Sequence, residues 1–338
     1  MSVVPLTNEN APASPQAAPP SFPARELAQQ ARLLSQKVLA EVARVVVGAD
    51  AVTQQLLIAL LAGGHVLLEG VPGVAKTTLS KVFARLLGCQ YQRVQFTPDL
   101  LPSDVTGTSI FDRNANDFVL RKGPIFTQVL LADEINRAPA KTQAALLEAM
   151  QENQVTVDGQ SLPLTPPFLV LATQNPVEQE GVYRLPEAQL DRFLLRIEMG
   201  YPGFTHEVNL LKLHSRPTVQ LEPMFDPATI LGLQAKLQYV YGDESLYEYI
   251  IRLAEETRRH PDVALGASPR AALNLLKCAR AHAVLEGRHY FTPADVQAIS
   301  YGVLGHRLIL RPEAEIEGKT SADVVREVLA AVHVFEAG

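Results

Sequence analysis

The residues with the clearest chemical role run from Gly70 to Thr77 and read Gly-Val-Pro-Gly-Val-Ala-Lys-Thr. An apolar stretch at 65–69 precedes them, and a helical pattern at 77–87 follows. Backbone N–H groups in such a turn converge on phosphate oxygens, and the helix N-terminus adds the positive end of its dipole. Lys76 would then reach the terminal phosphates, and Thr77 would bind Mg²⁺. The pattern favours nucleotide binding over an ordinary glycine-containing turn.

Ala75 departs from the general pattern G-x-x-x-x-G-K-[ST], which has glycine at this position. Alanine is the smallest possible replacement. We expect it to fit the loop on the condition that its φ angle is negative, because positive φ is free of steric cost only for glycine.

Two carboxylates form the second candidate group. Asp133 and Glu134 follow the apolar run 130–132, and ligands of open α/β sheets bind where such strands end. Asp133 is expected to hold Mg²⁺, directly or through water, and Glu134 to polarise the water that attacks the γ-phosphate. A solvated acidic turn is the alternative.

Three further polar side chains have candidate roles. Asn175 follows the next apolar run, where its amide can hydrogen-bond the γ-phosphate or the attacking water. Arg192 ends a short helix, and an arginine at a subunit surface can neutralise phosphate charge in a neighbouring subunit. Arg184 competes for this role. Arg270 lies in the first turn of a later helix, a poor place for a cation unless a phosphate is near. A turn asparagine and surface arginines remain the ordinary alternatives.

The elements that must position these residues alternate along the chain. Continuous apolar runs suit strands buried on both faces of a parallel sheet, so they predict an α/β doubly wound fold. The expected strands lie at 65–69, 91–96, 128–132 and 168–172. A hairpin turning at Asp158-Gly159 and a loop-rich insertion at 98–124 interrupt this order. Beyond a linker at 200–203 the pattern is helical, with helices expected at 24–45, 51–62, 244–259, 269–286, from 292 and at 321–334.

Composition sets the broad class. The chain has 338 residues, of which 47% are hydrophobic and 20% charged, as in a globular protein of about two domains. The net charge of −6 argues against broad nucleic-acid binding. Cys89 and Cys278 lie in apolar helical surroundings, which predicts free buried thiols in a reducing compartment. No run is long enough to span a membrane. Residues 1–23 are rich in alanine and proline, lack the pattern of a secretory signal, and are expected to be disordered.

Taken together, these motifs resemble the AAA+ ATPases and, within them, the MoxR family, from Ala24 to the C-terminus. Three stretches carry the resemblance, namely Leu68–Thr77, Leu131–Pro139 and Leu185–Phe193. The family's own nucleotide-binding turn has alanine where Ala75 stands, so this departure from the general pattern supports the assignment.

The resemblance implies a role for each motif. Asp133-Glu134 is Walker B, Asn175 is sensor 1, Arg192 is the arginine finger and Arg270 is sensor 2. The insertion 98–124 and the Asp158-Gly159 hairpin match the helix-2 insert and the pre-sensor hairpin of that branch. Val47 and Gly48 lie where relatives contact adenine, and Thr77 and Asp133 would bind the metal. Walker A is formed by Gly70, Val71, Pro72, Gly73, Val74, Ala75, Lys76 and Thr77.

The family also implies an architecture and an activity. A nucleotide-binding AAA+ domain at 24–201 would precede a smaller all-helical lid at 202–338. The subunits would form a homo-oligomeric ring in the cytoplasm, expected to be a hexamer. ATP would be hydrolysed with Mg²⁺ at the interfaces between subunits. Such proteins act as chaperone-like remodellers that mature or activate protein clients, some by aiding metal-cofactor insertion, often with a partner that carries a von Willebrand factor A domain.

Two other functions compete with this reading. Helicase-like AAA+ motors of DNA or RNA share the insert pattern, but they load the hairpin tip with basic residues, and 155–164 contains neither lysine nor arginine. A nucleotide-gated scaffold without catalysis would need no apparatus for the attacking water, so the Asp133-Glu134 pair and Asn175 argue against it.

Overall fold

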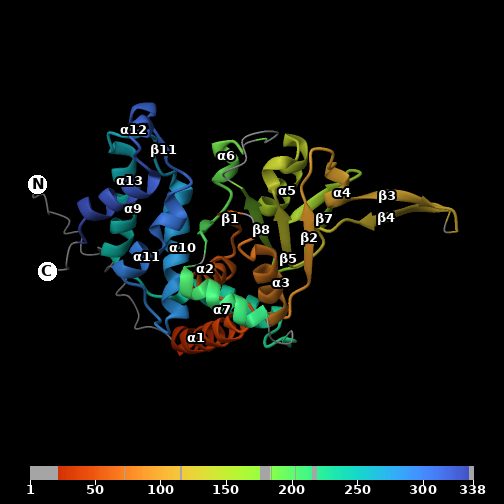
Figure 1. Ribbon diagram of the computed structural model, residues 1–338, viewed down its shortest axis with the longest axis horizontal. Coiled ribbons are helices and arrows are strands. Elements are labelled where there is room, and N and C mark those ends of the chain that lie inside the picture. Colours follow the sequence, from red (N-terminus) through yellow and green to blue (C-terminus); the bar gives the residue numbers. More distant parts are fainter. Residues whose placement is uncertain are drawn as a thin grey trace, which may run out of the picture.

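The computed structural model describes residues 22–71, 73–114, 116–175, 183, 185–201, 203–214 and 219–334 (Figure 1). Residues 1–21 of the segment predicted to be disordered lie outside this set, and the first helix begins at Phe22. The α/β body and the helical C-terminal part lie side by side, and a long hairpin extends from the body on the side away from the helices.

A five-stranded parallel sheet forms the centre of the α/β body, in the order β2-β5-β8-β1-β9. Its strands are β1 (Val66–Gly70), β2 (Tyr91–Gln95), β5 (Val129–Asp133), β8 (Leu169–Gln174) and β9 (Leu195–Met199). Four of them are the predicted strands. The order places β8 between β1 and β5, so the carboxyl ends of these three strands lie next to one another. Lys76 follows β1 across the loop, Asp133 ends β5 and Asn175 follows β8.

Both faces of the sheet are buried, which explains the continuous apolar runs. In β1, Val66 and Leu68 belong to one hydrophobic core, whereas Leu67 belongs to a second core on the opposite face. In β5, Leu131 and Leu130 are divided in the same way. The helices of the body are α1 (Phe22–Ala43), α2 (Asp50–Leu61), α3 (Lys76–Leu86), α5 (Ala140–Glu152), α6 (Glu187–Leu190) and the 3₁₀ turn η1 (Ile135–Arg137).

A buried histidine fixes the start of β1. The backbone N–H of Val170 donates to His65 Nδ1 at 3.0 Å, and His65 Nε2 lies 2.9 Å from the carbonyl oxygen of Met150. The neutral ring therefore carries its proton on Nε2 and donates it to Met150. Burial lowers the pKa of His65 from 6.5 to about 4, which keeps the ring neutral at pH 7.

The insertion at 98–124 is more regular than predicted. It contains α4 (Pro102–Thr106) and an antiparallel hairpin of β3 (Gly107–Asp112) and β4 (Asp117–Lys122). The turn-forming residues that suggested a loop lie mainly at the hairpin's end, and its strands are polar enough to resemble a loop. The predicted Asp158-Gly159 hairpin is present as β6 (Gln154–Val157) and β7 (Gln160–Pro163), with Val155 and Val157 in the core.

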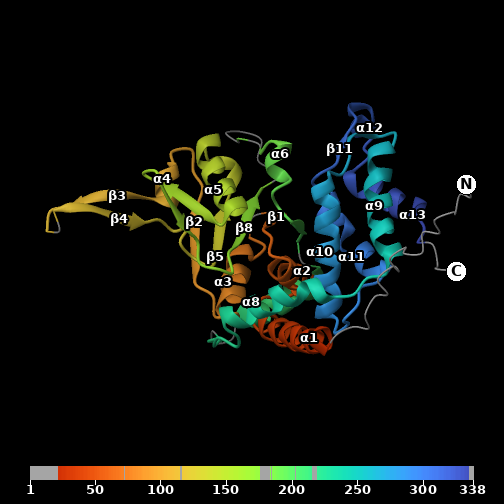
Figure 2. The ribbon, with the colours of Figure 1, turned by 180° about the vertical axis from the view of Figure 1, so that it is seen from behind.

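The C-terminal part is almost entirely helical, and its predicted helices are present (Figure 2). Its elements are α7 (Phe204–His214), α8 (Pro227–Lys236), η2 (Leu237–Tyr239), α9 (Glu244–Arg259), β10 (Val263–Leu265), α10 (Pro269–Leu285), α11 (Pro293–Leu304), β11 (Ile309–Leu310), α12 (Pro312–Ile316) and α13 (Ser321–Ala331). The division into 24–201 and 202–338 stays a prediction, because α1 packs on α2 and α3 and also on α8 and α10.

Two further expectations concern the thiols and the membrane. Cys89 and Cys278 are free and buried, as predicted, and burial raises their pKa values to about 11 and about 12. Among the helices that the structure describes, none has the length and apolar character needed to cross a bilayer.

Candidate active site

The phosphate-binding loop joins β1 to α3. A Cβ on Gly70 would lie 2.3 Å from the carbonyl oxygen of Met199, so glycine is required where β1 packs against β9. Gly73 has φ +86° and open space around its Cα. In the described structure no side chain caps the N-terminus of α3 at Ala75. The first amides of α3 are therefore open to a ligand, as an anion-binding helix end requires.

Ala75 does not meet the condition set by the sequence. Its φ is +61°, in the left-handed region, so the condition of a negative φ is not met. A non-glycine residue there costs roughly 1–2 kcal/mol, which explains why the general pattern has glycine at this position.

Lys76 and the acidic pair face the same space. Lys76 Nζ donates to the carbonyl oxygen of Gly70 at 2.6 Å, which turns the side chain back over the loop. Burial lowers the pKa of Lys76, and the negative charges of Asp133 and Glu134 oppose that shift. The ammonium group is thus held in an acidic, partly desolvated environment at the end of the sheet.

A threonine that the sequence analysis missed orders the two carboxylates. Thr173 Oγ1 donates to Asp133 Oδ1 at 2.5 Å and accepts from the backbone N–H of Glu134 at 2.9 Å. Glu134 has φ +57°, a strained value that is often found at functional positions. Gln95 Nε2 donates to Glu134 Oε2 at 2.5 Å, and Arg137 Nε lies 3.3 Å from the same oxygen.

The loop, the two carboxylates and Thr173 line a pocket of about 330 Å³, which we call the phosphate pocket. It is lined by Gly70, Gly73, Val74, Ala75, Lys76, Thr77, Thr78, Asp133, Glu134, Thr173 and Asn175. Most of the predicted loop, both carboxylates and the amide are therefore brought together. Val71 does not line this pocket, and Pro72 lies outside the described residues.

A second cavity of about 530 Å³ adjoins the phosphate pocket and shares Gly73, Val74, Ala75 and Thr78 with it. Val47 and Gly48, predicted to contact adenine, line this cavity. Its other walls include His206, Leu210 and Leu213 of α7, and Val219. The cavity is apolar on most sides, which suits a flat aromatic base better than another charged group.

The two candidate arginines do not reach the phosphate pocket of their own chain. Arg192 lies in the turn 191–194, called the arginine turn below, and Arg270 begins α10; neither lines the pocket. Arg270 Nη1 instead lies 4.0 Å from Asp191 Oδ2, with its side chain half exposed. Arg184, the competing candidate, lies outside the described residues.

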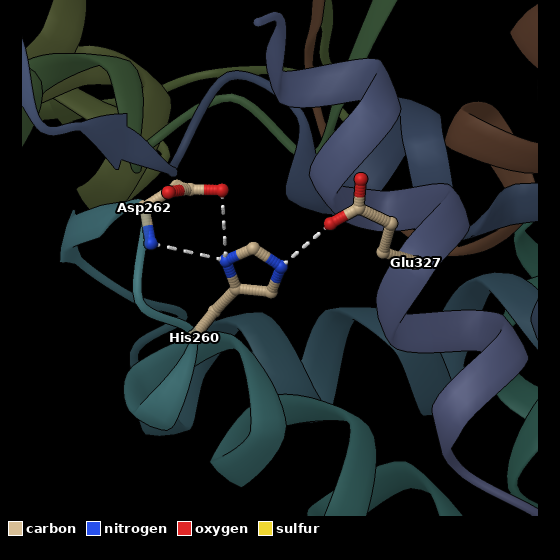
Figure 3. Close-up of side chains that lie close together, drawn as sticks. All are labelled: His260, Asp262 and Glu327. Carbon is tan, nitrogen blue, oxygen red and sulfur yellow. Dashed lines mark hydrogen bonds and ion pairs between the residues drawn. The ribbon is translucent and has the colours of Figure 1, made fainter. Parts of the chain in front are cut away.

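A cluster in the C-terminal part has metal-binding residue types but already holds a cation. His260, Asp262 and Glu327 lie close together (Figure 3). Lys319 Nζ lies 2.5 Å from Asp262 Oδ2 and 2.8 Å from Glu327 Oε2, and hydrogen bonds to these carboxylates raise the pKa of Lys319. Since the ammonium group bridges both carboxylates, the cluster is a structural ion-pair network.

The donor set of the phosphate pocket fits a magnesium nucleotide. Amide N–H groups and an ammonium group suit phosphate oxygens, while the Thr77 hydroxyl and the Asp133 carboxylate supply the hard oxygen ligands that Mg²⁺ prefers. The adjoining apolar cavity offers space for a base. The residues present therefore match the group that the motifs predicted.

Comparison with known proteins supports the family and the fold. The family model of the ATPase family associated with various cellular activities matches residues 65–195, and that of the AAA lid domain matches 255–328. A crystal structure from Cytophaga hutchinsonii, provisionally described as an ATPase, superposes with a TM-score of 0.86 at 41% identity, covering 93% of this chain and 98% of that one.

Related sequences extend over nearly the whole chain. Uncharacterized protein YeaC of Bacillus subtilis is 50% identical over 88% of this chain and 94% of its own length. Chaperone MoxR1 of Mycobacterium tuberculosis is 42% identical over 95% of this chain and 87% of its own, and protein MoxR of Methylorubrum extorquens is 33% identical over 86% and 91%. Motifs, sheet order and relatives thus agree, and the chain belongs to the MoxR family of AAA+ ATPases.

Proposed function

We propose that this chain binds ATP with Mg²⁺ in the phosphate pocket and hydrolyses it to ADP and phosphate. The observation that carries the proposal is the convergence of Lys76, Thr77, Asp133, Glu134 and Asn175 in one pocket of about 330 Å³. A phosphate-binding loop alone would support binding. A carboxylate pair and an amide beside it supply what hydrolysis needs in addition.

Each residue has a distinct task in this proposal. The backbone N–H groups of the loop from Gly73 onward and the Lys76 ammonium group hold the phosphates, while Thr77 and Asp133 hold the metal. When bound, Mg²⁺ neutralises charge on the phosphate oxygens. Glu134 orients the attacking water and accepts its proton. Asn175 hydrogen-bonds the γ-phosphate or the attacking water.

The adenine ring would occupy the adjoining cavity beside Val47 and Gly48. That cavity shares four residues with the phosphate pocket, so one nucleotide can extend through both. Gly48 has φ +72°, and a Cβ there would lie 3.1 Å from His206 Nδ1, so the wall is tightly packed.

The proposal includes assembly. Arg192 lies outside its own phosphate pocket, which supports a role as the arginine finger in a neighbouring subunit of a ring, expected to be a hexamer. Arg270 also lies outside the pocket and would reach phosphate only after a movement of the lid or from another subunit.

We further propose that hydrolysis drives chaperone-like remodelling of partner proteins in the cytoplasm. The name of the mycobacterial relative supports the chaperone role. The family resemblance supports a partner with a von Willebrand factor A domain and, for the client, assistance with maturation such as metal-cofactor insertion. The two unpaired buried cysteines agree with a reducing compartment.

A paired substitution tests the nucleotide site. Lys76→Ala should weaken binding of a fluorescent ATP analogue and abolish phosphate release. Lys81→Ala, in the same helix but exposed, should leave both unchanged. Equal binding by the two variants would remove the basis for the proposal.

The client can be sought with an arrested enzyme. Glu134→Gln should bind ATP without turnover and retain its client during purification from the native host. The Lys76→Ala variant serves as the control that cannot load nucleotide. Proteins enriched with the first variant and absent from the second, in the presence of ATP, are the candidate clients.

A further inference from the structure

A buried arginine in the lid holds the arginine turn. Arg307 follows α11, and its side chain is only 2% exposed. A guanidinium group has five N–H donors, and all are used. Nε donates to Asp191 Oδ1 at 2.7 Å, Nη2 to the backbone oxygens of Asp191 (3.2 Å) and Phe193, and Nη1 to those of Leu194 (3.3 Å) and Val303. All but the last of these acceptors belong to the arginine turn.

Arg192 lies between these acceptors and depends on them for its direction. In the part of the chain that the structure describes, no hydrogen bond or ion pair ties the Arg192 guanidinium to another residue. The helix before it, α6, has only four residues, too few to fix the turn alone. The planar guanidinium group of Arg307 therefore fixes the backbone on either side of Arg192, which the Arg192 side chain itself does not anchor.

The Asp191 carboxylate also meets the N-terminus of α10. Ser268 Oγ lies 3.4 Å from Asp191 Oδ1, and Arg270 Nη1 lies 4.0 Å from Asp191 Oδ2. One carboxylate is thus shared by two separate elements of the lid. Because both elements share the Asp191 carboxylate, a change in the direction of the arginine turn would break contacts with the lid. A movement of the lid would break the same contacts.

We propose that Arg307 is a positioning residue for Arg192: by fixing the arginine turn against the lid, it sets the direction of the finger that completes the neighbouring subunit's site. The assignment rests on the proposed function, and it makes the orientation of the lid in one subunit a determinant of hydrolysis in the next. Lysine cannot replace Arg307, since an ammonium group has three donors and no planar fork.

Mixed assemblies isolate the donated arginine. One subunit carries Arg192→Ala, which leaves its own phosphate pocket intact. The other carries Glu134→Gln, which disables its own pocket but keeps its finger. Hydrolysis in the mixture then requires Arg192 of the second subunit beside the pocket of the first. The test adds Arg307→Lys to the Glu134→Gln subunit and compares the recovered turnover.

We expect the recovered kcat to fall about tenfold or more, because displacing a catalytic group by about 1 Å costs roughly 10²-fold. The KM for ATP should stay the same, since the working pocket belongs to the other subunit. Asp191→Asn keeps every backbone acceptor and should act in the same direction, which covers the case in which Arg307→Lys does not fold. If the mixed assembly recovers its full turnover with each of the variants Asp191→Asn and Arg307→Lys, Arg307 is not a positioning residue for Arg192.

A matched control separates positioning from general weakening of the lid. Arg288 binds the buried Asp295 at 2.5 and 2.6 Å and makes no described hydrogen bond to the arginine turn. Arg288→Lys should leave recovery within about twofold, a change worth roughly 0.4 kcal/mol; an equal loss would overturn the assignment. An inactive wild type would refute the proposed function itself. An active wild type whose Arg192→Ala and Glu134→Gln mixture shows no recovery would refute the finger and this assignment together.

Discussion

The phosphate pocket and the arginine turn differ in how each is held together. The pocket is assembled from the ends of adjacent parallel strands, and its groups hydrogen-bond one another, as Thr173 does with Asp133 and Glu134. The arginine turn is held from outside, by Arg307 of the lid, and its own arginine does not line the chain's pocket.

The difference shows what one chain can and cannot supply. The pocket provides phosphate binding, the proposed metal ligands and the proposed base within a single subunit. In the proposed function, the arginine that offsets developing charge on the phosphate comes from another copy of the chain. Binding should therefore survive in an isolated subunit, whereas turnover should require assembly.

The largest expected effect concerns the arginine turn. Arg192→Ala should lower kcat by roughly 10³–10⁵-fold, the usual worth of an arginine finger, with little change in ATP affinity. Steady-state phosphate release and a nucleotide titration measure the two quantities. Arg184→Ala is the matched control, and a larger loss for that variant would transfer the finger to Arg184.

The next effect concerns the pocket itself. Glu134→Gln should lower kcat by roughly 10²–10⁴-fold while ATP binding persists, because it removes the group that accepts the proton of water. Single-turnover measurements isolate this step. Glu148→Gln, at an exposed position of α5, should have no effect. Unchanged hydrolysis by Glu134→Gln would assign the base to another residue.

Acid should weaken the α/β body through the buried ring of His65. The pKa of His65 is lowered by burial from 6.5 to about 4, so below pH 6.5 the unfolded chain takes up a proton that the folded chain refuses. The contribution of the neutral ring to the free energy of unfolding is fully present above pH 6.5. It is lost progressively between pH 6.5 and 4, by up to ~3 kcal/mol. Urea unfolding at pH 7.5 and 4.5 measures it. An equal free energy of unfolding at both values would contradict the neutral buried ring.

A second buried histidine, His306, contacts the arginine turn and should add to the loss of stability in acid. Its Nε2 lies 3.2 Å from the carbonyl oxygen of Phe193, and burial together with the charge of Arg307 lowers its pKa well below 6.5. Acid should therefore loosen both regions. Hydrogen exchange of amides in β1 and in the arginine turn tells which loosens first.

The smallest effect compares two positions of the phosphate-binding loop. Ala75→Gly removes left-handed strain of roughly 1–2 kcal/mol but adds about 0.5–1 kcal/mol of conformational entropy cost from the unfolded state, so a gain of up to about 1.5 kcal/mol is expected. Gly73→Ala, at φ +86° in open space, should have the opposite sign. Thermal unfolding measures both variants, and shifts of the same sign would exclude backbone strain as the cause.

The pocket was predictable because its chemistry is local in the sequence. Lys76, Asp133 and Asn175 each follow an apolar strand, and the carboxyl ends of parallel strands meet at one edge. Apolar runs predicted four strands of the sheet, and apolar residues at helical spacing predicted α9, α10, α11 and α13. The φ of Ala75 was not predictable from residue type, because the loop imposes its backbone on whatever residue stands there.

Contacts between distant segments were beyond the sequence. Arg307 and Asp191 are 116 residues apart, and nothing in the composition of either segment marks the pair. Gln95 ends β2 and Thr173 is the penultimate residue of β8, and neither belongs to a predicted motif, so only the sheet order reveals that they meet Glu134. The sequence predicts a loop-rich insertion where β3 and β4 lie, because the two strands are too little buried to leave a clear apolar pattern.

The two cysteines have a practical consequence. Thiolates react with maleimides and thiols do not, and burial raises the pKa of Cys89 to about 11 and that of Cys278 to about 12. Both should stay silent toward alkylating labels near neutral pH. A single cysteine introduced on the surface could then carry a fluorophore in an otherwise native background, which would allow motion of the lid to be followed during turnover.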